Sequence, residues 1–194
     1  FHTGQCTYGD SNMHFGFITS LATQQTFPPN YSISPSDKLC YPFLCDSISA
    51  SIYLFGASLR FSYMLPMYFA FLQVITGFYC IAKTWLGSAG KALLAWILFF
   101  YNGGLGFVYL LEGSAEGSYR FRDIFTGFYT TPTNLIDKNI RWVNIIVDML
   151  LPQRATLFGY AVLFTCIWLL LRGILHGETR LFPSAALLAG ALPM

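Results

Sequence analysis

The sequence predicts an all-α membrane protein: a multi-span helical bundle with interfacial helices and a long external loop. Three observations support this fold class. Of the 194 residues, 55% are hydrophobic and only 10% are charged, whereas soluble domains carry about 25% charged residues. Several long stretches of the chain contain no charged residue. The basic residues are densest in two short segments, as they are in the cytoplasmic loops of membrane proteins.

Three uncharged runs are long and apolar enough to cross a bilayer, which takes about 20 helical residues within a range of about 17 to 25. They cover residues 61–82, 92–111 and 155–171. A fourth uncharged run covers residues 181–194, and we expect it to be the start of a further span. Because the chain begins at Phe1 and stops inside this run, we expect it to be a fragment of a longer protein.

Residues 41–59 are apolar, but Asp46 interrupts them. The apolar residues recur at helical spacing and form one stripe, made of Leu44, Ile48, Ile52, Phe55 and Leu59. The polar residues Asp46, Ser49 and Tyr53 lie away from that stripe. A one-sided helix that is too short to span is typical of helices that lie in the membrane interface.

The distribution of basic residues orients the chain. The short loops 83–91 and 172–180 hold Lys83, Lys91, Arg172 and Arg180, so we place both loops in the cytoplasm. A spanning helix at 41–59 would instead put these basic loops outside, and we reject it. The predicted segments are a first external loop at 1–60, two transmembrane helices at 61–111, a second external loop at 112–154, and a transmembrane helix with the start of another at 155–194.

On the external side, Asp10 and His14 are candidate functional residues. They are four positions apart, so they share one face of the short helix that we expect over residues 11–25. A carboxylate just above the bilayer could accept a proton from a sugar hydroxyl. Asp is also a favoured residue at the start of a helix, and spacing alone favours that capping role.

Three external arginines, Arg60, Arg141 and Arg154, could each bind a lipid phosphate through a guanidinium fork. The ordinary alternative is that they flank the spans and reach toward the headgroups. Gln153 adds a neutral donor beside Arg154. Asp148 lies in an apolar helix, where it would pair with an arginine or face water.

Several other functions lack support in the sequence. The net charge of +2 and the absence of a basic run give no indication of nucleic-acid binding. The glycines of NGGLGF lack the lysine of a phosphate-binding loop. The three histidines have no zinc-binding spacing, so we name no metal ligand. Any disulfide among Cys6, Cys40 and Cys45 stays open.

The order of several motifs carries a family resemblance. They are YGDSNMHFGFITSLA, TFPPNYS and CYPFLCDSISASIYLFGASLRFSYMLPM. The matching positions are Asp10, His14, Phe27-Pro28-Pro29, Leu54-Phe55-Gly56, Arg60 and Leu65-Pro66. Together, over roughly residues 5–110, they resemble the GT-C class of membrane glycosyltransferases, which includes protein mannosyltransferases and lipid A aminoarabinose transferases. The motifs NGGLGF and MLLPQR resemble those of a bacterial subgroup.

The resemblance implies an enzyme of the bacterial plasma membrane that transfers a sugar from a polyprenyl-phosphate donor to an acceptor on the external face. Asp10 would be the catalytic base or would orient the acceptor. The arginines would hold the donor phosphate, with His14, Asp148 and Gln153 also lining the substrate site. A second acid beside Asp10 is missing, which leaves the use of a divalent metal open. We expect the fragment to be inactive alone.

Two other classes compete with the glycosyltransferase. A transporter or lipid flippase would place polar or charged groups in the middle of its spans. The middles of 61–82 and 155–171 offer only Gln73 and Thr165, which weakens this interpretation. The third class is a non-catalytic membrane scaffold, for which the second external loop would be a binding surface.

Overall fold

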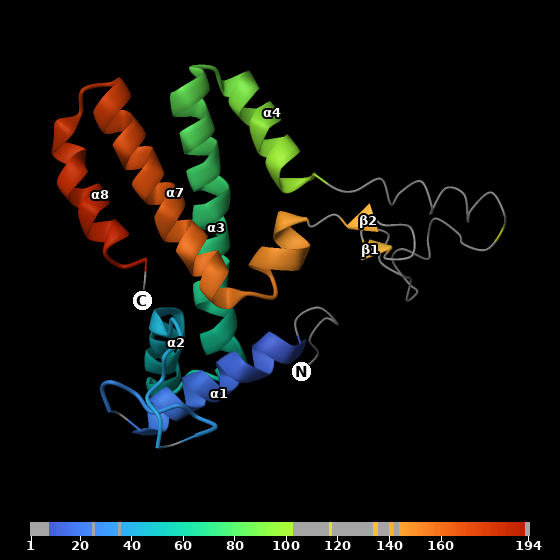
Figure 1. Ribbon diagram of the computed structural model, residues 1–194, viewed down its shortest axis with the longest axis vertical. Coiled ribbons are helices and arrows are strands. Elements are labelled where there is room, and N and C mark those ends of the chain that lie inside the picture. Colours follow the sequence, from blue (N-terminus) through green and yellow to red (C-terminus); the bar gives the residue numbers. More distant parts are fainter. Residues whose placement is uncertain are drawn as a thin grey trace.

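The computed structural model describes residues 8–24, 26–34, 36–102, 117, 134–135, 140–141 and 144–192, and the structural statements below concern these residues. They are mainly helical (Figure 1). The elements are α1 (Tyr8–Gln24), α2 (Leu44–Leu54), α3 (Leu59–Leu86), α4 (Ala89–Phe100), β1 (Asn134–Leu135), β2 (Ile140–Arg141), the π-helix η2 (Ile145–Leu150), α7 (Arg154–Leu175), the 3-10 helix η3 (Thr179–Leu181) and α8 (Phe182–Ala189).

Two long helices, α3 and α7, form the centre of the structure and run in the same direction (Figure 1). The amide Nε2 of Gln73 donates to the hydroxyl of Thr165 at 2.9 Å and to the carbonyl of Ala161 at 3.1 Å. Gly77 lets the helices approach closely, because a Cβ there would lie 3.1 Å from the Cβ of Phe164. Both helices therefore begin at one end of the molecule and finish at the other.

The boundaries of α3 follow from local chemistry. The hydroxyl of Ser58 accepts a hydrogen bond from the backbone N–H of Phe61 at 3.3 Å, which caps the first turn. At the other end, Gly87 has a φ of 65°, a left-handed conformation that ends helices and that glycine adopts without a steric penalty. Lys83 in the last turn places a positive charge near the negative end of the helix dipole.

Both α3 and α7 are long and apolar enough to cross a membrane. Their 28 and 22 residues correspond to lengths of about 42 and 33 Å, against a hydrocarbon core of about 30 Å. Only 22% of the most apolar stretch of α3 and 28% of that of α7 are buried. Core helices of a soluble domain would be mostly buried, so these exposed apolar surfaces suit a lipid environment.

Helix α4 turns back along α3. The indole N–H of Trp96 donates to the carbonyl of Ile75 at 3.1 Å, and the rings of Phe78 and Phe99 stack with centroids 4.2 Å apart. The helix ends at Phe100, after 12 residues or about 18 Å. That length is too short to span a bilayer. The part of the expected span 92–111 that follows residue 102 lies outside the described residues.

A single asparagine holds the end of α4. The side-chain amide of Asn144 donates to the carbonyls of Phe100 and Asn102, at 3.2 and 2.6 Å. Its oxygen accepts from the backbone N–H groups of Ile146 and Val147, at 3.0 and 3.1 Å, which caps η2. Asn144 therefore joins the last turn of α4 to the first turn of η2, and it lies 44 residues after Phe100 along the chain.

The run 181–194 begins as a short helix that folds back on α7 (Figure 1). The thiol of Cys166 donates to the carbonyl of Ala185 at 3.6 Å. The Phe182 ring packs so tightly on Gly173 that a Cβ on this glycine would lie 2.5 Å from it. Helix α8 covers eight residues.

Helices α1 and α2 lie at the end of the molecule where α3 and α7 begin (Figure 1). The expected helix over 11–25 is confirmed by α1. Helix α2 has 11 residues and is too short to span, as expected for 41–59. Its apolar stripe, which includes Leu44 and Ile48, is exposed, whereas Asp46 and Ser49 are fully buried. The helix thus turns its polar face toward the protein, an arrangement that suits a lipid surface.

Of the predicted second external loop, the structure describes few residues before α7. Strands β1 and β2 pair antiparallel, with Asn134 opposite Arg141. Among the cysteines predicted to lie outside, Cys40 and Cys45 are free thiols, and Cys6 lies outside the described residues.

Candidate functional site

Three side chains from distant parts of the sequence meet where α1, α2 and α7 come together. They are His14 from α1, Asp46 from the first turn of α2 and Arg154 from the first turn of α7. Each has 0% of its surface exposed. We call this group the buried cluster. It sits at the end of the molecule where the two membrane-length helices begin.

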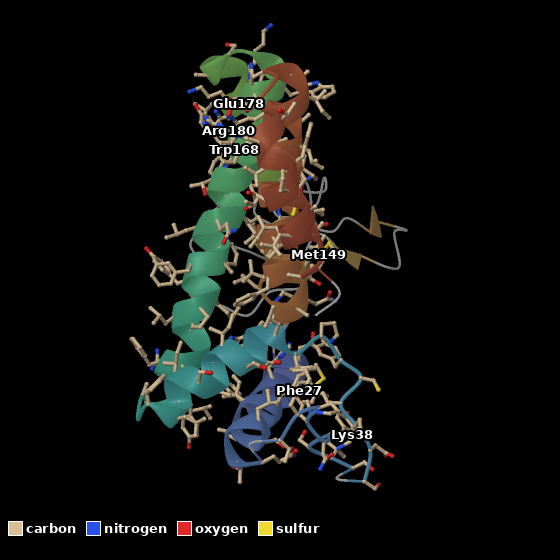
Figure 2. All side chains as sticks on the ribbon, turned by 90° about the vertical axis from the view of Figure 1, so that its left-hand side faces the viewer. Phe27, Lys38, Met149, Trp168, Glu178 and Arg180 are labelled. Carbon is tan, nitrogen blue, oxygen red and sulfur yellow. The ribbon has the colours of Figure 1, made fainter. Side chains whose placement is uncertain are left out.

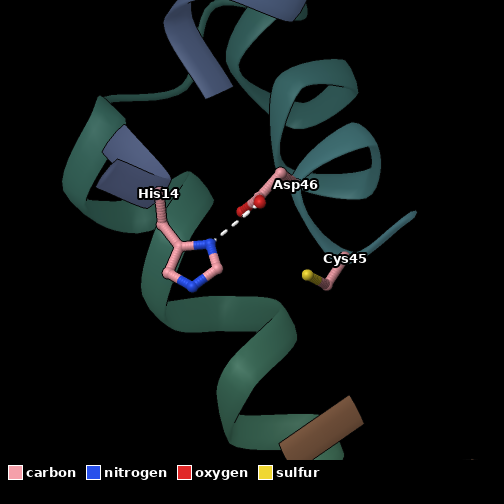
Figure 3. A group of neighbouring side chains, drawn as sticks. All are labelled: His14, Cys45 and Asp46. Carbon is pink, nitrogen blue, oxygen red and sulfur yellow. Dashed lines mark hydrogen bonds and ion pairs between the residues drawn. The ribbon is translucent and has the colours of Figure 1, made fainter. Parts of the chain in front are cut away.

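Asp46 is the centre of the buried cluster. Its Oδ2 lies 2.9 Å from Nδ1 of His14, and Figure 3 shows the two side chains pointing toward each other. Its Oδ1 lies 3.3 Å from Nε of Arg154. Because a carboxylate paired with an arginine can only accept hydrogen bonds, we assign the proton of this contact to Nδ1 of His14. The single carboxylate therefore holds both a histidine and an arginine.

Both terminal nitrogens of the Arg154 guanidinium hydrogen-bond to protein groups, while its Nε is buried and meets Asp46 as an ion pair without a hydrogen bond. One terminal nitrogen donates to the carbonyl of Tyr63 at 3.1 Å. The other donates to the carbonyl of Cys45 at 3.0 Å and to the hydroxyl of Ser49. The guanidinium carbon also lies 4.5 Å from the centre of the Tyr63 ring and 5.4 Å from that of Phe158. Such packing between rings and acceptors suits the flat, delocalised charge of arginine.

This geometry gives Arg154 a different position from the predicted one. We expected it to face a lipid phosphate at the membrane surface, or to reach toward the headgroups. Instead it is fully buried and its donors are directed at α2 and α3. The difference arises because Arg154 follows η2 and Pro152 at the start of α7, where the facing helix α2 supplies a carboxylate. Arg154 therefore holds the ends of three helices together.

His14 likewise turns inward. Sequence spacing placed it on one helix face with Asp10, and the structure bonds it to Asp46. Its second ring nitrogen, Nε2, is buried and has no hydrogen-bond partner among the described residues. The imidazole also packs edge-on against the rings of Phe17 and Tyr41, with centroids 6.1 and 5.8 Å apart. These contacts fix the orientation of the ring.

Asp10 lies one turn before His14 in the first turn of α1 and is half-buried. The charge of Asp10 also acts on Tyr41, which packs against His14. Burial raises the pKa of Tyr41, and the nearby charges of Cys45, Asp10 and Asp46 raise that pKa further. Tyr41 thus stays a neutral hydroxyl at physiological pH. Asp10 keeps partial access to the surface, whereas Asp46 is fully buried.

Of the remaining predicted residues, Arg60 and Gln153 lie outside the buried cluster. Arg60 is exposed in the first turn of α3. Gln153 is exposed and its side-chain oxygen accepts a hydrogen bond from Thr156 at 2.9 Å. For Arg141 in β2 and Asp148 in η2, the structure describes the backbone but not the side chain.

Cys45 brings a third metal-ligand type next to His14 and Asp46 (Figure 3). The potential ligand atoms of these three residues all lie within 4.8 Å of one another. Burial, followed by the charge of Asp46, raises the pKa of the Cys45 thiol to about 12, although Arg154 opposes the shift. Metal ions bind the thiolate, and the carboxylate of this group, Asp46, is already paired with Arg154. The donor set therefore fits an internal ion pair better than a metal centre.

Sequence reasoning treated Asp46 and Ser49 as interruptions of an apolar helix and missed them as partners. The spacing of Asp46 and Ser49 in the sequence could have indicated this role. The two residues are three positions apart, so they share a face opposite the apolar stripe. A helix whose stripe faces lipid must turn its other face toward protein, and a charge on that face needs a partner.

No family model, no curated protein and no solved structure matches this chain.

Proposed function

We propose that the chain is part of a GT-C-like membrane glycosyltransferase that moves a sugar from a polyprenyl-phosphate donor to an acceptor on the external face of the plasma membrane. The observation that carries the proposal is the position of Asp10. It is a half-buried carboxylate directly beside a sealed His–Asp–Arg cluster, at the end where two membrane-length helices begin. The sequence resemblance assigns the catalytic role to this same aspartate.

Each residue has a distinct part in this proposal. Asp10 accepts the proton of the acceptor hydroxyl as the bond to the sugar forms, while the phosphate leaves with the electrons of the broken bond. His14, Asp46 and Arg154 are positioning residues, because they fix α1 against α2 and α7. Arg60, exposed at the start of α3 on the same end, is the candidate ligand of the donor phosphate. Arg141, Asp148 and Gln153 keep their predicted roles at the substrate site.

The orientation of the helices supports a common compartment for these residues. Because α3 and α7 are parallel, Arg60 and Arg154 lie at the same end, with α1 packed against that end (Figure 1). Figure 2 marks this end by Phe27 and Lys38 and the opposite end by Trp168, Glu178 and Arg180. The basic loops predicted to be cytoplasmic are at the opposite end, which agrees with an external position for Asp10.

The transporter and flippase alternative receives less support. Gln73 and Thr165, the polar groups in the middles of the two spans, hydrogen-bond to each other and to a backbone carbonyl. The hydrogen bonds of these two side chains therefore join the two helices to each other and do not face a transported solute. The surface that a scaffold role would use, the second external loop, lies largely outside the described residues.

The test uses the full-length protein in membranes and transfer of a labelled sugar from a polyprenyl-phosphate donor. Asp10→Asn should lower the rate by about 100-fold or more, because loss of a positioned base typically costs that much. Asp37→Asn is the matched control, since Asp37 is an exposed acid at the same end. Transfer at the normal rate by Asp10→Asn protein that inserts and folds would remove Asp10 from catalysis.

A further inference from the structure

The end of the helix pair opposite the buried cluster contains a cavity of about 350 Å³. Its lining comes from the last turns of α3 and α7. Lys83, Thr84 and Gly87 lie on one side, and Trp168 and Arg172 lie on the other. His176, just after α7, completes the lining. The cavity thus opens where two membrane-length helices finish.

The positive charges of this cavity come from both helices. Arg172 pairs with Glu178, with Nε and Oε1 3.1 Å apart, and its guanidinium lies 5.4 Å from the centre of the Trp168 ring. These contacts hold the arginine in place at the mouth of the cavity, although Glu178 offsets its charge. Lys83 is exposed on the opposite wall. The cavity therefore combines a guanidinium held by Glu178 and Trp168 with an exposed ammonium.

The surroundings strengthen the positive potential. Residues 83–91 and 172–180 contain four basic residues and one acidic residue, a net charge of +3 with histidine neutral. Such a field favours an anion. It also disfavours a zwitterionic headgroup, whose own cation would enter the same positive region.

The position of the cavity indicates that the anion is attached to a lipid. Trp168 is an amphipathic ring of the kind that lies at the level of lipid headgroups. In the same last turns of α3 and α7, the large apolar side chains of Trp85, Ile174 and Leu175 are exposed. Acyl chains can lie along this apolar surface while a phosphate occupies the basic cavity. Basic pockets at the ends of membrane helices bind acidic lipid headgroups in this way.

We propose that this cavity binds the phosphate of an anionic phospholipid on the face opposite the proposed sugar-transfer site. The proposal rests on the membrane orientation given above and is independent of sugar transfer. Lys83 and Arg172 hold the phosphate oxygens, Thr84 donates from its hydroxyl, and Trp168 packs against the glycerol region.

The test measures lipid binding to the purified full-length protein by native mass spectrometry, with phosphatidylglycerol and phosphatidylcholine as probes. One phosphatidylglycerol should stay bound in preference to phosphatidylcholine. Lys83→Gln should weaken phosphatidylglycerol binding by about fivefold, as expected for the loss of one basic residue at a membrane surface. Lys91→Gln is the matched control: it makes the same charge change at the same end, but Lys91 is outside the cavity lining.

Two results would overturn the proposal. One is an equal effect of Lys83→Gln and Lys91→Gln, which would mean that only the general charge of the face matters. The other is inorganic phosphate binding that depends on Lys83 while phosphatidylglycerol does not bind, which would assign the cavity to a free anion. Arg172→Gln combined with Glu178→Gln keeps the net charge and should weaken lipid binding further. Resistance of the protein to alkaline extraction from membranes, and the sugar-transfer assay, test the two earlier proposals separately.

Discussion

The Nε atom of Arg154 lies 3.3 Å from Oδ1 of Asp46, and both side chains have no exposed surface. The two residues are 108 positions apart, so their contact joins the first turn of α2 to the first turn of α7. A buried charge that loses its partner costs about 3–5 kcal/mol, because its desolvation is no longer offset. The Asp46–Arg154 pair is therefore a sensitive point of the fold.

The first prediction concerns this pair. Asp46→Asn should lower the free energy of unfolding in mixed micelles by about 3–5 kcal/mol, since it leaves the Arg154 charge buried without a counter-charge. Arg180→Gln changes an exposed charge at the other end and should alter the value by about 0.5 kcal/mol or less. A stable Asp46→Asn protein would show that Arg154 finds other compensation.

The second prediction isolates one hydrogen bond of the buried cluster. Ser49→Ala removes the hydroxyl that accepts from Arg154 and should cost about 1.5–3 kcal/mol, the range for bonds to charged groups. Ser51→Ala lies on the same helix, but its hydroxyl is exposed and bonds only the carbonyl of Ser47. It should be nearly neutral in the same unfolding measurement. Equal losses of unfolding free energy in both variants would mean that the hydrogen bond from Arg154 to Ser49 adds no stability.

The third prediction uses cysteine reactivity. Burial and the charge of Asp46 raise the pKa of Cys45 to about 12, so at pH 8 only about one thiol in 10,000 is the reactive thiolate. Because the raised pKa favours the protonated form, the thiolate fraction grows only as the pH approaches 12. Alkylation followed by mass spectrometry should label the exposed Cys40 much faster than Cys45. Comparable rates in folded protein would contradict the burial of Cys45.

The fourth prediction tests the packing of α3 on α7. Gly77→Leu should destabilise the protein by about 1–3 kcal/mol, because the new side chain would collide with Phe164. Gly159→Ala on α7 meets no atom within 4 Å and should be neutral or stabilising, since alanine favours the helix. Thermal unfolding in detergent measures both. Tolerance of leucine at position 77 would require the two helices to separate.

The fifth prediction addresses sidedness. In intact cells or oriented vesicles, a cysteine in place of Lys38 should react with a membrane-impermeant reagent added outside, and a cysteine in place of Arg180 should not. These two positions lie at opposite ends of the molecule (Figure 2). Labelling of both from the same side would end the proposed orientation, and with it the external position of Asp10.

The two long apolar helices could be predicted because they follow from composition along a single helix. The uncharged runs 61–82 and 155–171 lie within α3 and α7. The short helix that begins near Asp10 also followed from local signals. The end of α4 did not, because Asn144, a residue far along the chain, caps it at Phe100. No local pattern distinguishes an apolar run that spans from one that stops at such a cap.

The candidate site was predicted only in part for a related reason. Periodicity placed Asp46 and Ser49 on one face of α2, but it does not say whether that face meets water or protein. The same limit applies to Arg154, whose sequence neighbourhood is that of an ordinary arginine at the end of a span. Pairing across 108 residues depends on how α2 and α7 pack, which composition and spacing do not contain. His14 was predicted to bind substrate, which stays a prediction, and its contact with Asp46 was not predicted.

The double role of Asn144 makes two helix ends depend on one side chain. Its side-chain amide donates to the carbonyls of Phe100 and Asn102, while its side-chain oxygen accepts from the backbone N–H of Ile146. A single substitution at this position should therefore loosen the end of α4 and the start of η2 together, whereas most substitutions that remove a cap affect only one helix.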